Sequence, residues 1–115
     1  MEFNNNTPIY IQIYDWLCEE LLNDSLLENG RLKSVRELGA DIGVNPNTIM
    51  RTYEKLTNDN IIYNKRGIGY FFYEDAKTKI LSEQREQFIN EEVPRILKKM
   101  ELLGLNIEIF KDGKF

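Results

Sequence analysis

The chain of 115 residues contains no histidine. This absence removes the commonest general base and the commonest metal ligand in proteins. Cys18 is the single cysteine, so the sequence provides neither a disulfide framework nor a cysteine-based metal site. Its serine and cysteine side chains have no histidine to activate them, so the sequence argues against an enzyme and predicts no metal or other cofactor.

Long apolar runs are also missing. No stretch approaches the roughly 20 apolar residues that a membrane-spanning helix needs. The first eight residues, MEFNNNTP, lack the basic and apolar regions of a secretory signal. We therefore expect a cytoplasmic protein with no membrane partner.

Positive charge is absent from residues 1–30, which carry six acidic side chains. Residues 31–70 carry seven basic and four acidic side chains, whereas residues 71–115 carry eight and nine, and the whole chain has a net charge of −4. A nucleic-acid-binding surface needs local positive charge, so the middle segment is the candidate. The acidic total leaves open a second hypothesis, a protein-interaction module without specific DNA binding.

Residues 34–56 predict two short helices joined by a tight turn. Ser34 and Glu37 fit a capping box at the start of the first helix, and Gly43 suits its end because glycine adopts positive φ at little cost. The apolar residues of this helix recur at the spacing of one buried face: Val35, Leu38 and Ile42.

The second helix of the pair is predicted to begin with Asn45 as its cap and Pro46 in its first turn. Its inward side is expected to hold Ile49, Tyr53 and Leu56, and its outward side Asn47, Thr48, Met50 and Arg51. This layout is typical of a helix-turn-helix, in which the second helix lies in the DNA major groove.

A further helix is expected before this motif and a β-hairpin after it. Residues 8–22 hold apolar side chains at helical steps: Ile9, Ile13, Trp16, Leu17 and Leu21. Leu26 and Leu27 are expected to pack beneath the next helix, and Asn29-Gly30 predicts a turn. Residues 61–63 and 70–73 are β-prone and flank a short glycine-containing segment with Lys65 and Arg66, which predicts a β-hairpin. Such a hairpin is either the wing of a winged helix or a plain surface hairpin, and the preceding helix pair favours the wing.

From Ala76 onward the pattern is helical again. An apolar stripe comprises Ile80, Leu81, Phe88, Ile89, Val93, Ile96, Leu97, Met100 and Leu103. Pro94 predicts a kink or two abutting helices, Gly104 an end, and Asn106 a cap for a last turn at 107–110 before a frayed tail. The stripe either packs across a two-fold axis or folds back on its own domain, and we favour a homodimer through residues 76–110.

These motifs resemble the GntR family of bacterial transcription regulators, and most of all its YtrA subfamily. The resemblance lies in PIYIQI at 8–13, GRLKSVREL at 30–38, GVNPNT at 43–48 and RGIGYF at 66–71. It implies a winged helix-turn-helix dimer, usually a repressor, that binds double-stranded DNA. Two positions depart from the family pattern: Lys33 replaces a usual proline, and Met50 stands where several members have arginine.

The expected fold is thus mainly α with a small β-hairpin: a winged helix-turn-helix domain at 1–75 and dimerisation helices at 76–115. The candidate DNA-binding residues are Lys33, Ser34, Arg36, Asn45, Asn47, Thr48, Arg51, Lys65, Arg66 and Gly67, of which Lys33 and Lys65 are included for their charge and the others are implied by the resemblance. Arg36 has an alternative role, an ion pair with Glu37 or Asp41. A small-molecule effector would bind between the winged domain and the C-terminal helices, and no residue pattern identifies one.

Overall fold

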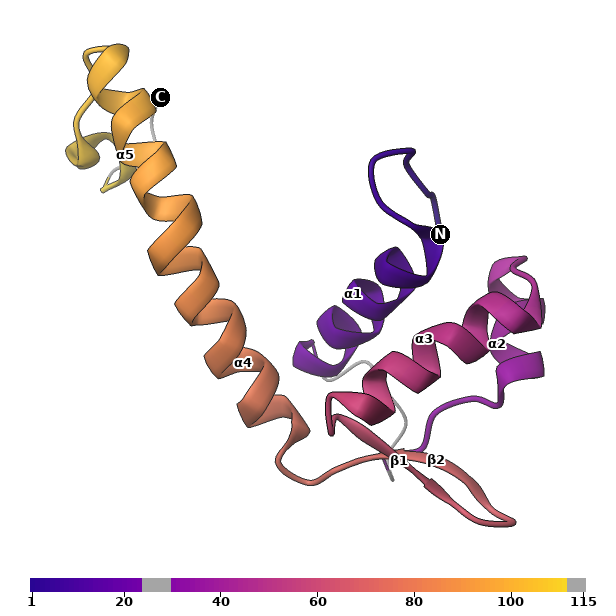
Figure 1. Cartoon of the computed structure of the whole chain (residues 1–115). Helices are drawn as coiled ribbons and strands as arrows, with labels where there is room; N and C mark the ends of the chain where they lie inside the picture. Colours follow the sequence, from indigo (N-terminus) through magenta and orange to yellow (C-terminus); the bar gives the residue numbers. More distant parts are fainter. Residues whose placement is uncertain (24–29, 112–115) are drawn as a thin grey trace. The chain divides into compact units, whose positions relative to one another are not determined.

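The computed structural model of the chain describes residues 1–23 and 30–111, and it forms two compact units, Met1–Leu81 and a second unit from Ser82 onward (Figure 1). The expectations for Leu26, Leu27 and Asn29, and for the tail beyond Lys111, lie outside the described residues.

The first unit begins with α1, Ile9–Leu22, as the apolar periodicity predicts. Gln12 ties the preceding segment to this helix, since its side-chain amide donates to the carbonyl oxygens of Asn4 (2.9 Å) and Thr7 (2.7 Å). The buried face consists of Ile13, Leu17 and Cys18. Ile9, expected on this face, is instead 43% exposed, because it lies in the first turn at the end of the helix.

The predicted helix pair is confirmed as α2, Val35–Ile42, and α3, Pro46–Asn58. Gly43 ends α2 in the left-handed conformation with φ 69°, and Asn45 caps α3 by accepting a hydrogen bond from the backbone N–H of Asn47 (2.8 Å). Ser34 Oγ accepts from the Glu37 N–H (3.1 Å). No return bond from the Ser34 N–H to the exposed Glu37 carboxylate forms within the described part of the chain, so half of the expected capping box is present.

The tight turn between α2 and α3 depends on a small residue inside α2. Gly39 is buried, and its carbonyl oxygen accepts a hydrogen bond from the Val44 N–H at 2.9 Å. A Cβ atom at this position would lie 2.7 Å from the Val44 carbonyl oxygen, which is closer than real contacts allow. The absence of a side chain at Gly39 therefore permits the turn at Val44 to pack closely against α2.

The predicted hairpin forms from β1, Ile62–Lys65, and β2, Gly69–Phe72, paired antiparallel with Lys65 opposite Gly69. Arg31 and Leu32, which precede α2, pair with β2 along its free edge. The Leu32 N–H donates to the Tyr70 carbonyl oxygen (2.9 Å), and Arg31 forms an isolated bridge with Phe71. This pairing attaches the hairpin to the helix-turn-helix.

One apolar core joins these elements. Its members are Ile13, Leu17, Cys18, Leu32, Leu38, Ile49, Tyr53, Leu56, Ile61, Ile62, Phe72, Ala76 and Ile80. The inward side of α3 is as expected, because Ile49, Tyr53 and Leu56 are fully buried. The last two core residues come from the start of α4, Ala76–Gln87. The core therefore holds α3 by its buried side and leaves the other side of the helix exposed to solvent.

The second unit continues as helix. A π-helical segment η1, Phe88–Glu92, leads into α5, Val93–Leu102, so the helices expected to abut near Pro94 are joined through one wide turn. Proline lacks an N–H, which disfavours the regular bond pattern at this point. Gly104 follows with φ 68°, and Asn106 caps the short 3-10 helix η2, Ile107–Phe110, as predicted. Met100 is buried, but most of the apolar stripe is exposed.

Candidate nucleic-acid interface

The solvent-exposed side of α3 presents four residues at the spacing i, i+3, i+4, i+7: Asn47, Met50, Arg51 and Glu54. This spacing places the side chains on one helix face. Thr48, expected on the outer face, is half-buried instead, because it lies beside the turn that contains the buried Ile49 and Thr52. The free face of α3 therefore offers an amide, a thioether, a guanidinium and a carboxylate.

Contacts with neighbouring elements fix both flanks of this face. On one flank the Arg51 guanidinium lies over the ring of Tyr10 in α1, 4.0 Å from the ring centroid. On the other flank the Tyr70 hydroxyl of β2 contacts the Met50 sulfur at 3.9 Å. Both contacts order side chains that would otherwise move freely, which lowers the entropy cost of binding a ligand there.

A second connection between α1 and α3 centres on Asp59, the residue after α3. Its Oδ2 accepts hydrogen bonds from Tyr14 Oη (2.7 Å) and Lys55 Nζ (2.9 Å). Burial pushes the pKa of Asp59 upward, but these hydrogen bonds and the charges of Lys55 and Lys79 together outweigh burial and hold the pKa below its usual value. The carboxylate thus stays ionised and holds α3 against α1.

The polar side chains that begin the two helices already serve as caps. Asn45 Oδ1 and Ser34 Oγ each accept a backbone N–H, so their oxygen atoms are occupied. The Asn45 amide N–H₂ and the Ser34 hydroxyl hydrogen remain available as donors. Both groups can therefore donate to an anionic ligand without breaking the caps.

The alternative role expected of Arg36, an ion pair with Glu37 or Asp41, does not form among the residues that the structure describes. Asp41 pairs with Lys33 and not with Arg36. Arg36 is exposed and has no ion pair among residues 1–23 and 30–111. The sequence offered Asp41, as a nearby acid, for an alternative ion pair with Arg36, whereas the fold brings Lys33 to it from the preceding segment. The Arg36 guanidinium is the more available of the two cations.

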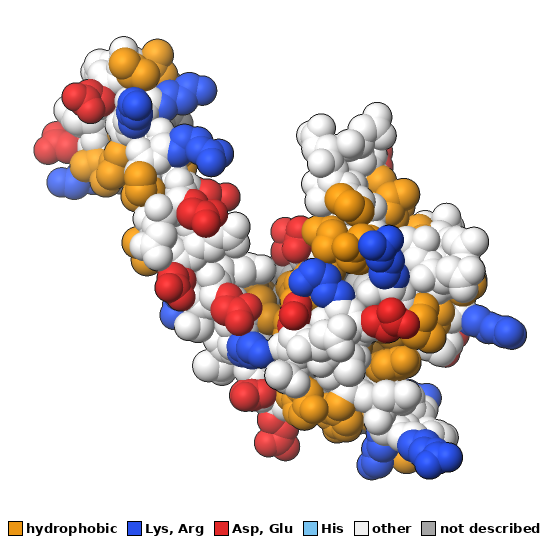
Figure 2. All heavy atoms as spheres, in the orientation of Figure 1, with side chains coloured by type: hydrophobic (Ala, Val, Ile, Leu, Met, Phe, Trp, Pro, Cys, Tyr) orange, Lys and Arg blue, Asp and Glu red, His pale blue; other side chains and the backbone are white. Residues whose placement is uncertain are grey.

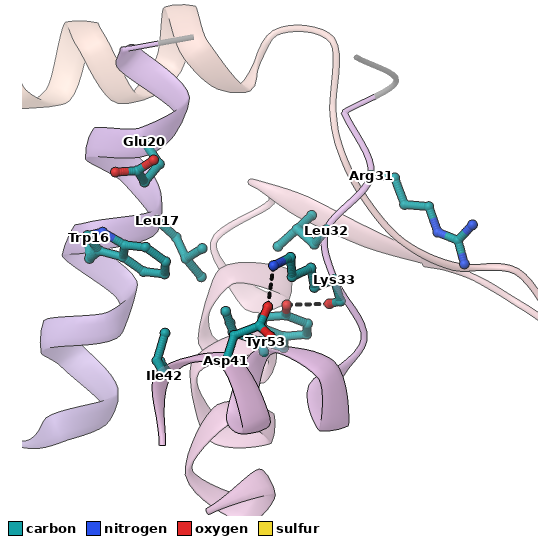
Figure 3. Close-up of a pocket in the computed structure, with 10 residues that line it drawn as sticks. Trp16, Leu17, Glu20, Arg31, Leu32, Lys33, Asp41, Ile42 and Tyr53 are labelled. Atoms are coloured by element: carbon teal, nitrogen blue, oxygen red, sulfur yellow. Dashed lines mark hydrogen bonds and ion pairs between the residues drawn. The ribbon is translucent and has the colours of Figure 1, made fainter. Parts of the chain in front are cut away.

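The Lys33–Asp41 pair stands at the edge of a cavity of about 350 Å³ between α1, α2 and the chain at 31–33 (Figure 3). Tyr53 also lines this cavity, and its hydroxyl donates to the Lys33 carbonyl oxygen at 2.6 Å. Burial, followed by the proximity of Tyr70 and Glu37, raises the pKa of Tyr53 well above its usual value. The hydroxyl remains a donor and fixes the segment that enters α2.

Basic side chains gather at the tip of the hairpin, at the lower right of Figure 2. Lys65 and Arg66 are exposed there, and Gly67 completes the turn with φ 79°. Arg31 adds a third cation, since its Nη2 donates to the Ile68 carbonyl oxygen at 2.8 Å, and Figure 3 shows it directed along the hairpin and away from the cavity. Arg31 therefore adds a positive charge to those that Lys65 and Arg66 of the hairpin itself supply.

Sequence reasoning missed Arg31, Tyr10 and Glu54. A helical wheel of α3 identifies Glu54, because it follows Asn47 by two turns. The contacts of Arg31 and Tyr10 join residues 37 and 41 positions apart along the chain, and no local pattern reports them.

The described residues, 1–23 and 30–111, contain no group of acidic, histidine or cysteine side chains placed to hold a metal ion. Within the same ranges, no helix combines the length and the apolar character needed to cross a membrane.

A helix-turn-helix followed by a basic two-stranded wing defines the class of this protein, a winged-helix DNA-binding protein. A scan against protein-family models finds no match. The chain is 37% identical to the uncharacterized HTH-type transcriptional regulator YhcF of Bacillus subtilis (strain 168), over 97% of this chain and 91% of that protein. It is 34% identical to the HTH-type transcriptional repressor YtrA of the same organism, over 90% and 79%.

A solved structure from Bacteroides thetaiotaomicron, a putative transcriptional regulator of the GntR family, has a TM-score of 0.70 and 44% identity, with 90% of each chain covered. The chain belongs to the GntR family of helix-turn-helix transcriptional regulators and is YtrA-like. Its function is DNA-binding transcriptional regulation.

Proposed function

We propose that this protein is a homodimeric repressor that binds a pseudo-palindromic operator. The observation that carries the proposal is the free face of α3, which presents Asn47 and Arg51 in the same domain as the basic tip of the hairpin. Each protomer places α3 in the major groove of one half-site, and the two half-sites lie roughly one helical turn of DNA (about 34 Å) or somewhat more apart. The relative YtrA, itself named a repressor, supports this direction of regulation.

Base readout is assigned to the exposed side chains at the start of α3. The Asn47 amide suits adenine, and the Arg51 guanidinium suits guanine or a phosphate. Tyr10 holds Arg51 at the flank of the helix, so Arg51 reaches bases or phosphates from a defined position. Thr48 contributes its hydroxyl and Asn45 its amide N–H₂ at the first turn.

Phosphate contacts are assigned to groups around this face. At the start of α2 the Ser34 hydroxyl and the Arg36 guanidinium donate to the DNA backbone, with Lys33 adding charge beside its Asp41 partner. On the wing, Lys65 and Arg66 contact phosphates, and Gly67 allows close backbone approach. Such contacts supply affinity and register with little sequence information.

The homodimer proposal rests on the apolar stripe of residues 76–110. Its exposed side chains include Phe88 (47%), Ile89 (61%), Ile96 (44%), Leu97 (47%), Leu102 (78%) and Leu103 (62%). Large apolar side chains exposed in this number along one helical segment mark an interaction site. A second copy of the chain is the occupant that two matching half-sites require.

Analytical ultracentrifugation tests the dimer. Wild type is expected to sediment as a dimer and Leu97→Glu as a monomer, whereas Lys98→Glu, at the neighbouring exposed position, serves as the control for added negative charge. The monomeric variant is expected to lose most of its operator affinity, because the two half-sites no longer bind together. A wild-type monomer at micromolar concentration would contradict the proposal.

Fluorescence anisotropy with a labelled duplex from the chain's own promoter, against a shuffled duplex at two salt concentrations, tests DNA binding. Asn47→Ala is expected to cost about 1–3 kcal/mol and to relax base preference. Lys65→Ala is expected to weaken all sequences alike and to reduce the salt slope by about 1 per protomer. Equal loss across operator variants for both substitutions would show that Asn47 reads no base.

A further inference from the structure

Glu54 lies at the centre of the free face of α3. We propose that Glu54 determines operator specificity by accepting a hydrogen bond from the amino group of a cytosine in the major groove. The inference rests on the proposed function, because it requires α3 to enter that groove.

The neighbours of α3 define where the centre of its free face lies. Arg51 marks the flank toward α1 through its contact with Tyr10, and Met50 marks the flank toward the wing through its contact with Tyr70. Glu54 lies between these flanks and follows Asn47 by seven residues, which puts the two within about 20° of each other around the helix axis. Glu54 therefore faces the same way as Asn47, about 10 Å further along the helix.

The carboxylate of Glu54 is left unpaired by the fold. It is exposed and forms no hydrogen bond or ion pair with any residue in the described ranges 1–23 and 30–111. The nearest basic residues along the helix are engaged elsewhere, Arg51 with the Tyr10 ring and Lys55 with Asp59. Asp41 and Asp59, by contrast, each have a cationic partner.

An unpaired carboxylate on this face is repelled by the phosphates of any duplex it approaches. That cost is offset at a position where the carboxylate accepts a hydrogen bond, and the cytosine N4 amino group is a major-groove donor suited to Glu. Adenine also has an amino group, but in the major groove it lies between two acceptors, adenine N7 and thymine O4, whereas the cytosine amino group has an acceptor on one side only. Glu54 thus penalises most sequences and favours one that presents cytosine.

The position of that cytosine follows from the helix geometry. A separation of about 10 Å along α3 corresponds to roughly three base-pair steps of 3.4 Å. We therefore expect the cytosine within roughly three base pairs of the base pair that Asn47 contacts.

Selection from a pool of duplexes with a randomised segment, followed by anisotropy on the selected sequences, tests the inference with the full-length protein. The variants are Glu54→Gln and Glu54→Ala. Glu19→Gln in α1 is the control, since it removes one exposed negative charge away from α3. Wild type and the control are expected to select the same motif, with one constrained cytosine.

The expected result is a change confined to that position. Glu54→Ala loses the preference for cytosine by about tenfold, Glu54→Gln shifts it toward adenine, and the other positions of the motif stay as in wild type. If both variants select the wild-type motif and bind every sequence more tightly, Glu54 merely repels phosphate and the inference is wrong. If wild type itself selects no motif, the proposed function fails, and this inference fails with it.

Discussion

Removal of the Tyr53 hydroxyl tests how the chain holds the start of α2 against α3. The ring is fully buried and contacts Tyr70 edge-on, with centroids 4.9 Å apart. The hydroxyl donates to the Lys33 carbonyl oxygen at 2.6 Å, one residue before the Ser34 cap. Tyr53→Phe keeps the ring and its packing, so the substitution removes one hydrogen bond and creates almost no cavity.

The magnitude follows from that single change. A typical hydrogen bond contributes a net 0.5–1.5 kcal/mol, and a buried acceptor left without a donor costs about 1–3 kcal/mol. Lys33 itself is exposed, so water compensates part of the loss at its carbonyl. We expect Tyr53→Phe to lower the free energy of unfolding by about 1–2 kcal/mol.

Urea unfolding followed by circular dichroism measures this difference, at one fixed protein concentration because self-association adds to stability. Tyr63→Phe is the matched control. Tyr63 is a half-buried tyrosine of the same domain that stacks on Phe71, and its hydroxyl has no hydrogen-bond partner within residues 1–23 and 30–111. Its loss is expected to change stability by less than about 0.5 kcal/mol. Equal effects of the two substitutions would refute the role assigned to the Tyr53 hydroxyl.

Three further predictions concern other contacts of the winged domain. Gly39→Ala is expected to destabilise the protein by about 1–3 kcal/mol in urea unfolding, because the added Cβ meets the Val44 carbonyl oxygen at 2.7 Å; an unchanged midpoint would contradict the close approach. Asp59→Asn is expected to lower the free energy of unfolding at pH 7 and to match wild type more closely below about pH 4. The reason is that the pKa of Asp59 is lower in the folded state than in the unfolded state. The stabilisation from its ionised carboxylate is therefore complete above the unfolded-state pKa and is lost as the pH falls through the folded-state pKa. A gap between the two proteins that stays constant with pH would refute this sign. A double-mutant cycle of Tyr10→Leu and Arg51→Gln is expected to give a coupling of about 0.5–1 kcal/mol that Tyr10→Phe preserves, and additive effects would show that the cation–π contact contributes nothing.

The sequence determined the local structure of this protein because the responsible contacts are short-range. Ser34, Gly43 and Asn45 act on backbone groups within a few residues, so the bounds of α2 and α3 follow from residue type and order. The hairpin follows equally from two β-prone runs around a glycine-containing turn, and the inward side of α3 from its helical spacing. Those elements in that order already indicated a winged helix-turn-helix.

The tertiary structure alone decided which side chains are free to act on a ligand. Asp41 pairs with Lys33 rather than with Arg36, Arg51 is held on Tyr10, and Arg31 reaches the wing from outside it. The Arg51–Tyr10 and Arg31–Ile68 partners are 41 and 37 residues apart and meet because the core packs α1 and the hairpin against α3, whereas Lys33 reaches Asp41 from the segment that precedes α2. The free face that remains, with Glu54 unpaired at its centre, is a property of that packing, since a helical wheel shows which residues share a face and not which of them find partners.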